Sequence, residues 1–194
     1  MNTLDKNNFH YTSLFCEENI WKLIESSFTN NIIKPVDVLF IINELNSVAL
    51  FEQNISNGKQ AVIWDYHVVL TAQVDNQLKI LDFDSRCEFP CDINTYFNKT
   101  FINYSLLENC YKPYIKAIPA ELYYHNFTST RQHMKGIIAE SEYPKHELII
   151  PDNTTNLITL EDCRAFDIDN KHNSHHRDIL TPLEYLESMT TPNR

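Results

Sequence analysis

Three side chains that nucleophilic thiol enzymes use occur in order along the chain: Cys16, His67 and an aspartate at position 82 or 84. A helix N-terminus and a nearby imidazolium both lower the pKa of a thiol, and a carboxylate can fix the orientation and tautomer of the imidazole. The set therefore contains the parts that nucleophilic thiol catalysis needs. The alternative interpretation is a buried apolar cysteine and a strand histidine with ordinary packing partners.

Two glutamates follow the cysteine directly, and they act on it in opposite ways. Glu17 and Glu18 fall in the first turn of the helix expected there, where negative side chains suit the macrodipole. The same charges oppose ionisation of the neighbouring thiol. If Cys16 is a nucleophile, we expect an imidazolium partner to offset them.

A helix, a strand and a β-hairpin are expected to position these residues. Apolar residues recur at the helical period over 16–28, which predicts a helix that starts at the cysteine. The segment 36–42 has the composition of a buried strand. The segments 61–70 and 78–84 are rich in β-branched and aromatic residues, and the Asp-Asn pair at 75–76 favours a tight turn. We therefore predict an antiparallel hairpin.

The register of this hairpin places an aspartate beside the histidine in either of two ways. With a turn centred on residues 75–76, His67 lies opposite Asp84 and diagonal to Asp82. A slip of two residues places His67 directly opposite Asp82. Because side chains alternate along a strand, both aspartates share the face of His67 in either register. The register alone does not choose between them.

The remaining sequence gives weaker signals. We expect a short strand over 115–118, a partly helical segment over 122–135 and a closing helix over 182–189. No repeat, low-complexity tract or linker divides the sequence, which predicts one domain over residues 1–194.

Composition and charge exclude several classes of function. The 194 residues contain only two glycines, so neither a phosphate-binding P-loop nor a dinucleotide fingerprint is present. The net charge is -10 and no Lys or Arg cluster occurs, which argues against nucleic-acid binding. No run approaches the ~18 apolar residues of a membrane span, and the N-terminus lacks the sections of a signal peptide. The five cysteines, an odd number, are expected to be reduced thiols in the cytoplasm.

Two short clusters resemble metal sites only superficially. Cys87 and Cys91 are close in sequence, but no second pair follows, so we expect reduced thiols near a turn. The stretch 172–176 is rich in histidine and is expected to be a polar loop. We therefore predict no metal site and no cofactor.

Four strings resemble the eukaryotic protein N-terminal glutamine amidohydrolase family. In chain order they are C-E-E-N-I-W-K-L from Cys16, V-I-W-D-Y-H-V-V-L from Val62, D-F-D from Asp82 with F-P-C from Phe89, and N-F-x-S-x-R-x-H-M-K from Asn126. They follow the order of the family over residues 11–135. The two longest strings contain the candidate cysteine and the candidate histidine.

This resemblance implies both an activity and a fold. The family hydrolyses the side-chain amide of an N-terminal glutamine, which releases ammonia and leaves an N-terminal glutamate that enters an N-degron pathway. The implied fold is α+β of the papain/transglutaminase type, with an N-terminal helix carrying the cysteine packed on an antiparallel β-sheet carrying the histidine and aspartate. Matched residue by residue, Cys16 is the nucleophile, His67 the base and acid, and Asp82, rather than Asp84, the orienting carboxylate.

Recognition of a free N-terminus requires a group for the α-ammonium, and a buried carboxylate suits this purpose. Glu18 and Asp84 are preferred because they lie next to the matched residues. Glu17 and Asp65 are the other acidic candidates. Further candidate contacts to the substrate or to the oxyanion, with capping or packing as the alternative, are Tyr11 and Ser13.

Three functions follow from these residues. The first is an amidohydrolase for proteins or peptides with a free N-terminal Gln, acting as a monomer in the cytoplasm, with the nucleus as a further location, and without a nucleic-acid or membrane partner. The second is a thiol protease or a transglutaminase-like acyl transferase, because the same side chains act on other amides. The third is a catalytically idle module that binds protein N-termini, which the intact Cys16, His67 and Asp82 disfavour.

Overall fold

The computed structural model describes residues 4–30, 32–151, 155–167 and 179–191, so the histidine-rich stretch 172–176 lies outside the described ranges. The α-helices are α1 (Cys16–Asn30), α2 (Ile93–Thr100), α3 (Ala120–Asn126), α4 (Leu160–Arg164) and α5 (Pro182–Thr190). The strands are β1 (Ile33–Ile42), β2 (Val48–Leu50), β3 (Val62–Trp64), β4 (His67–Val74), β5 (Gln77–Leu81), β6 (Cys91–Asp92) and β7 (Tyr114–Pro119). Short 3-10 turns are η1 (Lys6–Asn8), η2 (Tyr104–Leu106), η3 (Asn109–Tyr111), η4 (Gln132–Met134) and η5 (Glu140–Glu142).

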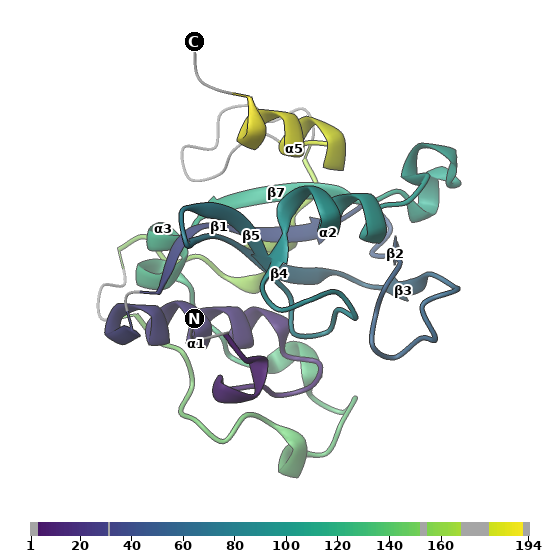
Figure 1. Ribbon diagram of the computed structural model, residues 1–194. Coiled ribbons are helices and arrows are strands. Elements are labelled where there is room, and N and C mark those ends of the chain that lie inside the picture. Colours follow the sequence, from purple (N-terminus) through teal and green to yellow (C-terminus); the bar gives the residue numbers. More distant parts are fainter. Residues whose placement is uncertain (1–3, 31, 152–154, 168–178, 192–194) are drawn as a thin grey trace.

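A five-stranded antiparallel sheet forms the middle layer of the molecule, in the order β6-β5-β4-β1-β7. Helix α1 covers one face, and α2 and α5 lie over the other (Figure 1). The buried side chains divide in the same way. One apolar cluster joins Ile20 of α1 to Phe40 of the sheet, and a second joins the opposite face to Phe97 and Tyr185. This mixed α/β arrangement is compatible with the expected α+β class.

Helix α1 begins at Cys16, as the sequence predicts, and ends at Asn30. Ile20, Leu23 and Ile24 are each 1% exposed, so the apolar stripe of the helix is removed from water against the sheet. Burial of such side chains contributes roughly 1.5–3 kcal/mol each. The prediction of a helix with the cysteine at its first position is therefore confirmed.

The predicted hairpin is present as β4 and β5. Val74 pairs with Gln77 and Leu70 with Leu81, the register expected for a turn centred on residues 75–76. Asp75 and Asn76 both have positive φ, 51° and 62°, which these two residue types tolerate better than most and which the tightest hairpin turns require.

The prediction of one strand over 61–70 is wrong in one respect, because this segment is divided between two sheets. Its first part is β3, which pairs with β2 in a separate two-stranded sheet, and β4 starts only at His67. The pairing of β4 with β5 also stops at Leu81, so His67 has no strand partner on that side and pairs with Ile41 of β1 instead. The chain leaves the sheet after Leu81, and this exit releases the two aspartates from strand geometry.

The other predicted elements are found with altered boundaries. The strand expected over 36–42 lies within β1, and the strand expected over 115–118 lies within β7. Only part of 122–135 is helical, because α3 ends at Asn126 and a short 3-10 turn follows later. The closing helix begins at Pro182 as expected. Among the described residues, no helix has the length and apolar character that crossing a membrane would need.

Candidate active site

Cys16 lies where the start of α1 meets the start of β4. It is partly buried, and its Sγ is 3.7 Å from Glu17 Oε2, to which the thiol donates a hydrogen bond. Burial, followed by the charges of Glu17 and Asp84, raises the pKa of the thiol well above its ordinary value, and the backbone N–H of Val68 only partly opposes the rise. The resting form is therefore the neutral thiol, and the lowering of its pKa expected from the helix N-terminus is outweighed.

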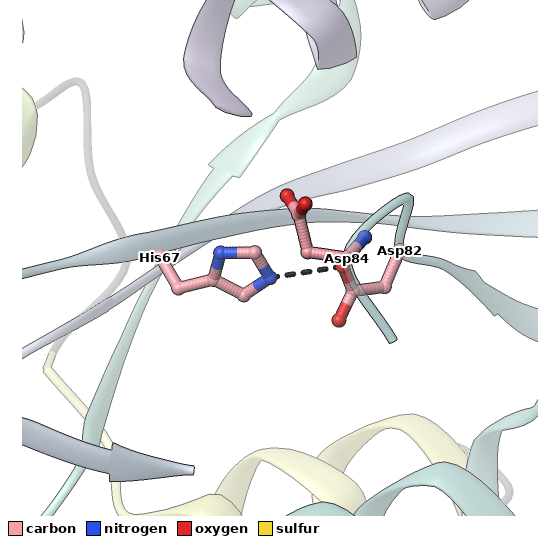
Figure 2. A group of neighbouring side chains, drawn as sticks. All are labelled: His67, Asp82 and Asp84. Atoms are coloured by element: carbon pink, nitrogen blue, oxygen red, sulfur yellow. Dashed lines mark hydrogen bonds and ion pairs between the residues drawn. The ribbon is translucent and has the colours of Figure 1, made fainter. Parts of the chain in front are cut away.

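His67, the first residue of β4, is hydrogen bonded to Asp82 in the loop after β5 (Figure 2). The distance from Nε2 to Oδ1 is 2.9 Å, and both side chains are buried. Burial lowers the pKa of His67, but the charge of Asp82 and the hydrogen bond outweigh burial and raise it overall. Burial raises the pKa of Asp82, and His67 with the other donors outweighs it and lowers that pKa overall. The Asp82 carboxylate therefore stabilises the protonated form of the imidazole relative to that of a free histidine.

Two further donors hold the carboxylate of Asp82. Tyr96 of α2 donates its hydroxyl to Oδ2 at 2.7 Å, and the backbone N–H of Asp84 donates to Oδ1 at 2.9 Å. Both oxygen atoms are thus occupied, so the carboxylate and the imidazole bonded to it are held in one orientation. The contact of Tyr96 is not predictable from the sequence, because Tyr96 lies 14 residues after Asp82 in another element and no local pattern indicates the contact.

The second ring nitrogen of His67, Nδ1, does not face Asp82 (Figure 2). It is the ring atom left to exchange a proton with a thiol. The Cys16 thiol is close enough to the backbone N–H of Val68, the residue after His67, to be stabilised by it. Trp64 stacks on the imidazole with ring centroids 5.4 Å apart and an interplanar angle of 20°. The thiol therefore lies beside the residue that follows His67, and the imidazole is bonded to the carboxylate of Asp82.

Asp84 lies at the edge of this group, beside His67 (Figure 2). The Tyr11 hydroxyl donates to Asp84 Oδ1 at 2.5 Å, and Tyr11 itself is 44% exposed. Burial raises the pKa of Asp84, the nearby His67 lowers it, and the result is a raised pKa. Ser13, also exposed, hydrogen bonds to the Tyr11 hydroxyl. Tyr11 and Ser13 thus lie on the approach to the histidine.

His67, Asp82 and Asp84 are also the group within the described ranges whose metal-ligand atoms lie within 4.8 Å of one another. A metal ion bound there would need free lone pairs on these atoms. The oxygens of Asp82 already accept hydrogen bonds from His67, Tyr96 and the Asp84 backbone. The donor set therefore fits an oriented imidazole better than a metal ligand shell.

Glu18 is enclosed by donors that do not belong to this group. The Arg131 guanidinium forms a fork with it, with 2.9 Å from Nε to Oε1 and 2.8 Å from Nη2 to Oε2, and Ser129 donates to Oε1 at 2.6 Å. His146 Nε2 lies 3.4 Å from Oε2. A substrate ammonium would have to displace these partners. Ser129 and Arg131 both lie in one of the four strings, but no local pattern indicates their pairing with Glu18.

Glu17 is fully buried, and among the described residues no Lys or Arg side chain is paired with it as Arg131 is with Glu18. Its Oε2 accepts a hydrogen bond from Tyr66 at 2.9 Å, and its Oε1 lies 3.5 Å from His133 Nε2. Burial raises the pKa of Glu17 to about 7. The residue next to the cysteine is therefore a carboxyl group that titrates near neutral pH.

Asp65 lies outside the buried group. Its side chain is 59% exposed and forms an ion pair with Arg164 at 3.4 Å. Arg164 in turn lies over the ring of Tyr66, 4.4 Å from its centroid. Asp65 thus borders the site through Tyr66 and does not enter the hydrogen-bonded group around His67.

The model of the N-terminal glutamine amidase family matches residues 11–179 of this chain. The chain belongs to this family. The match runs beyond the four strings, which end at Lys135, and it includes the segment that contributes His146.

Individual relatives are similar over a shorter part of the chain. The chain is 37% identical to the protein N-terminal glutamine amidohydrolase of Danio rerio over 128 residues and 37% identical to that of Homo sapiens over 129 residues. It is 33% identical to that of Drosophila grimshawi over 132 residues. Each alignment covers 64% of this chain, and 63%, 62% and 63% of the three relatives. The aligned region thus spans less than two thirds of the length of each relative.

Proposed function

We propose that this chain is a thiol amidohydrolase that converts the N-terminal glutamine of proteins and peptides to glutamate and releases ammonia. The observation that supports this most strongly is the buried hydrogen bond between His67 and Asp82 beside the helix-opening Cys16, in a chain of the N-terminal glutamine amidase family. The helix carrying the cysteine and the antiparallel sheet carrying the histidine also support a papain/transglutaminase-like arrangement in a single domain.

The reaction passes a proton through one imidazole twice, once as the thioester forms and once as it is hydrolysed. His67 Nδ1 accepts the proton of the Cys16 thiol as sulfur attacks the carboxamide carbon, and the imidazolium then gives this proton to the departing ammonia. A water molecule, deprotonated by the same nitrogen, hydrolyses the thioester and restores the thiol. Asp82 stabilises the imidazolium that forms between these steps.

The raised pKa of the Cys16 thiol determines when the proton moves. Burial and the Glu17 charge keep the thiol neutral at rest, so His67 acts as a general base during the attack. The hydrogen bonds that fix Asp82 keep the imidazole oriented for this transfer. The neutral resting thiol is also less open to alkylation and oxidation than a thiolate.

Asp84 is the carboxylate best placed to receive the α-ammonium of the substrate. It adjoins His67, and Tyr11 at the exposed side holds its Oδ1 in place. Glu18 is occupied by Arg131, and Asp65 is exposed, so these two earlier candidates rank below it. A charge-assisted contact at Asp84 would reject internal glutamines, whose backbone nitrogen is an uncharged amide.

The product and setting follow by family analogy. N-terminal glutamate would feed an N-degron pathway, and we propose a monomer that acts in the cytoplasm, with the nucleus as a further location. The substrate needs only a free N-terminal Gln, so proteins and peptides both qualify.

Peptides that differ only in their first residue test this function. The protein is incubated with peptides beginning in Gln, in Asn and in acetylated Gln, and with one carrying Gln internally, while ammonia and peptide mass are followed. We expect ammonia only from the free N-terminal Gln, with a mass gain of about one dalton as the amide becomes an acid. Cys16→Ala should abolish release, and Cys110→Ala, a partly buried thiol elsewhere, should not.

The other readings give different products. Backbone cleavage would indicate a thiol protease, and incorporation of an added amine would indicate an acyl transferase. Binding of the Gln peptide without any turnover would indicate an idle recognition module. Each of these results would contradict the proposed amidohydrolase.

A further inference from the structure

Asn19 joins the first turn of α1 to the chain that approaches it. The side chain is 1% exposed. Its Oδ1 accepts the backbone N–H of Thr12 at 2.8 Å, and its Nδ2 donates to the backbone carbonyl of Thr12 at 2.8 Å. We call these two hydrogen bonds the Asn19 clamp. The clamp closes a loop that contains Cys16, so the cysteine sits between two fixed points of the backbone.

The loop closed by the clamp contains a tight turn with an unfavourable residue in it. Phe15 N–H bonds to the carbonyl of Thr12 at 3.3 Å, and Leu14 has a φ of 68°. This left-handed region favours glycine and is disfavoured for a residue with a Cβ. The Leu14 side chain is 46% exposed, so its burial does not compensate. The turn therefore depends on contacts elsewhere, and the clamp supplies two of them.

The N-terminus of α1, which follows this turn, has no Ser, Thr, Asp or Asn in the position before its first residue. The residue before Cys16 is Phe15, which is fully buried and has no hydrogen-bonding side-chain atom. The first backbone N–H groups of a helix have no intrahelical acceptor, and the Phe15 side chain cannot accept from them. The Glu17 carboxylate accepts its own backbone N–H, whereas the Cys16 N–H lies at the proposed nucleophile, where the oxyanion of a tetrahedral intermediate would form.

We propose that Asn19 is a positioning residue for the reaction proposed above. By holding Thr12, it fixes the turn that leads into α1, and thereby the position of Cys16 and of its backbone N–H. The inference rests on the proposed function for its kinetic consequence. Its structural consequence, a thiol held in one place next to the imidazole, is independent of which amide the enzyme hydrolyses.

Asn43 offers a matched control for a change at Asn19. It makes the same pair of bonds to one residue: Oδ1 accepts the Ser47 N–H at 2.9 Å and Nδ2 donates to the Ser47 carbonyl at 2.9 Å. It is also buried, at 4% exposed, and its other partners are the carbonyls of Cys110 and Lys112. Truncation at either asparagine thus removes similar bonds, but only one set adjoins the cysteine.

The test compares Asn19→Ala with Asn43→Ala on the free N-terminal Gln peptide. We expect similar losses of thermal stability, a fall in kcat of about 10- to 100-fold for Asn19→Ala alone, and a KM within about threefold of the original. Adding Leu14→Gly to Asn19→Ala should restore part of kcat, because glycine adopts the turn without the clamp. Equal kcat in the two alanine variants, or no rescue by glycine, would overturn the inference.

A second measurement keeps this result separate from the proposed function. The rate of Cys16 alkylation by iodoacetamide, followed by peptide mass spectrometry at neutral pH, reports the thiol and its imidazole without any substrate. We expect a slower rate for Asn19→Ala and an unchanged rate for Asn43→Ala. If the original protein releases no ammonia but this difference holds, the proposed function fails and the positioning role of Asn19 stands. If the two variants alkylate equally, the positioning role fails.

Discussion

The carboxylates around the start of α1 differ because their partners differ. Glu18 is paired with the Arg131 guanidinium, whereas Glu17, one residue earlier, is buried beside the thiol and has a pKa raised to about 7. Asp82 accepts three hydrogen bonds that lower its pKa, and Asp84 has a pKa raised by burial. Carboxylates thus provide a structural ion pair, a group that titrates near neutral pH and a hydrogen-bond acceptor that holds the imidazole.

Asp84→Asn tests the proposed ammonium contact. The asparagine can still accept the Tyr11 hydroxyl, so the change removes charge and little else. A lost charge-assisted contact of about 1.5–3 kcal/mol should raise KM for the Gln peptide roughly 10- to 100-fold. The measurement is steady-state kinetics, with Asp65→Asn as the control because Asp65 is exposed. An unchanged KM in Asp84→Asn would remove this residue from the substrate site.

Glu17→Gln tests the control of the thiol by its neighbour. The titratable groups that face Glu17 are Cys16, Glu18, Tyr66 and His133. Its negative charge raises the pKa of the Cys16 thiol, so removing it should move the pH profile of Cys16 alkylation by iodoacetamide to lower pH. The profile is measured without substrate, by peptide mass spectrometry of the alkylated protein.

The control for this profile is a glutamate in the same helical position elsewhere. Glu121 lies in the first turn of α3 and is exposed, so Glu121→Gln removes a first-turn charge without touching the thiol. Its profile should coincide with that of the original protein. An identical shift in both variants would mean that the overall charge of the protein, and not the contact with Cys16, moves the pH profile.

At the scale of elements, the sequence correctly predicts those helices and strands that a local residue pattern specifies. Helix α1 and the hairpin of β4 and β5 are correct because an apolar period and a two-residue turn are sufficient to specify them. The interruption of the strand after Trp64 was not predictable, because β3 belongs to a second sheet and pairs there with β2, which lies in a separate segment of the chain. Tertiary pairing overrides a continuous strand-forming composition there.

The two aspartates illustrate the same limit within the site. Alternation in a strand placed both beside His67, and both are indeed its neighbours. The pairing stops at Leu81, however, so the hydrogen bond to Asp82 arises from the loop and not from the register. Resemblance to a family selected Asp82 where strand geometry could not. The contact of Tyr96 with Asp82 was not predicted, because Tyr96 lies in α2 on the face of the sheet opposite α1.

Arg131→Met tests how firmly α1 is tied to the segment after α3. The guanidinium and Glu18 are both buried, so removing one partner leaves an uncompensated charge. Breaking such a pair costs roughly 3–5 kcal/mol of the free energy of unfolding. Urea denaturation measures this loss, and adding Glu18→Gln should recover part of it. Arg164→Met, which breaks an exposed pair, should cost about 1 kcal/mol or less.

At the scale of the whole molecule, the candidate site joins all three layers. Cys16 comes from the helix on one face, His67 from the sheet, and Tyr96, which holds Asp82, from the helix on the other face (Figure 1). Movement of either helical layer against the sheet would therefore disturb the alignment of thiol and imidazole. Rigid packing of both apolar clusters is part of what the chemistry requires.

The dependence of stability on pH should carry the signature of Glu17. Its pKa is about 7 in the folded protein against an ordinary value of 4.5, so between these values the folded state binds more protons than the unfolded state. The free energy of unfolding therefore falls as pH rises through this window, by roughly 3 kcal/mol when complete. In urea titrations at pH 5 and pH 8, the free energy of unfolding of Glu17→Gln should rise relative to that of the original protein at the higher pH. Parallel behaviour of the two proteins would contradict the raised pKa.

The enclosure of α1 by late parts of the sequence has a consequence for synthesis. Tyr123 donates to the backbone carbonyl of Glu17, and Arg131, which binds Glu18, lies 113 residues further along the chain. A nascent chain exposes the first turn of α1 on the ribosome long before these partners emerge, and contacts between distant residues form slowly. Pulse alkylation during refolding should therefore find Cys16 protected only in the final phase. The proposed nucleophile would become competent only as the polypeptide that surrounds it is finished.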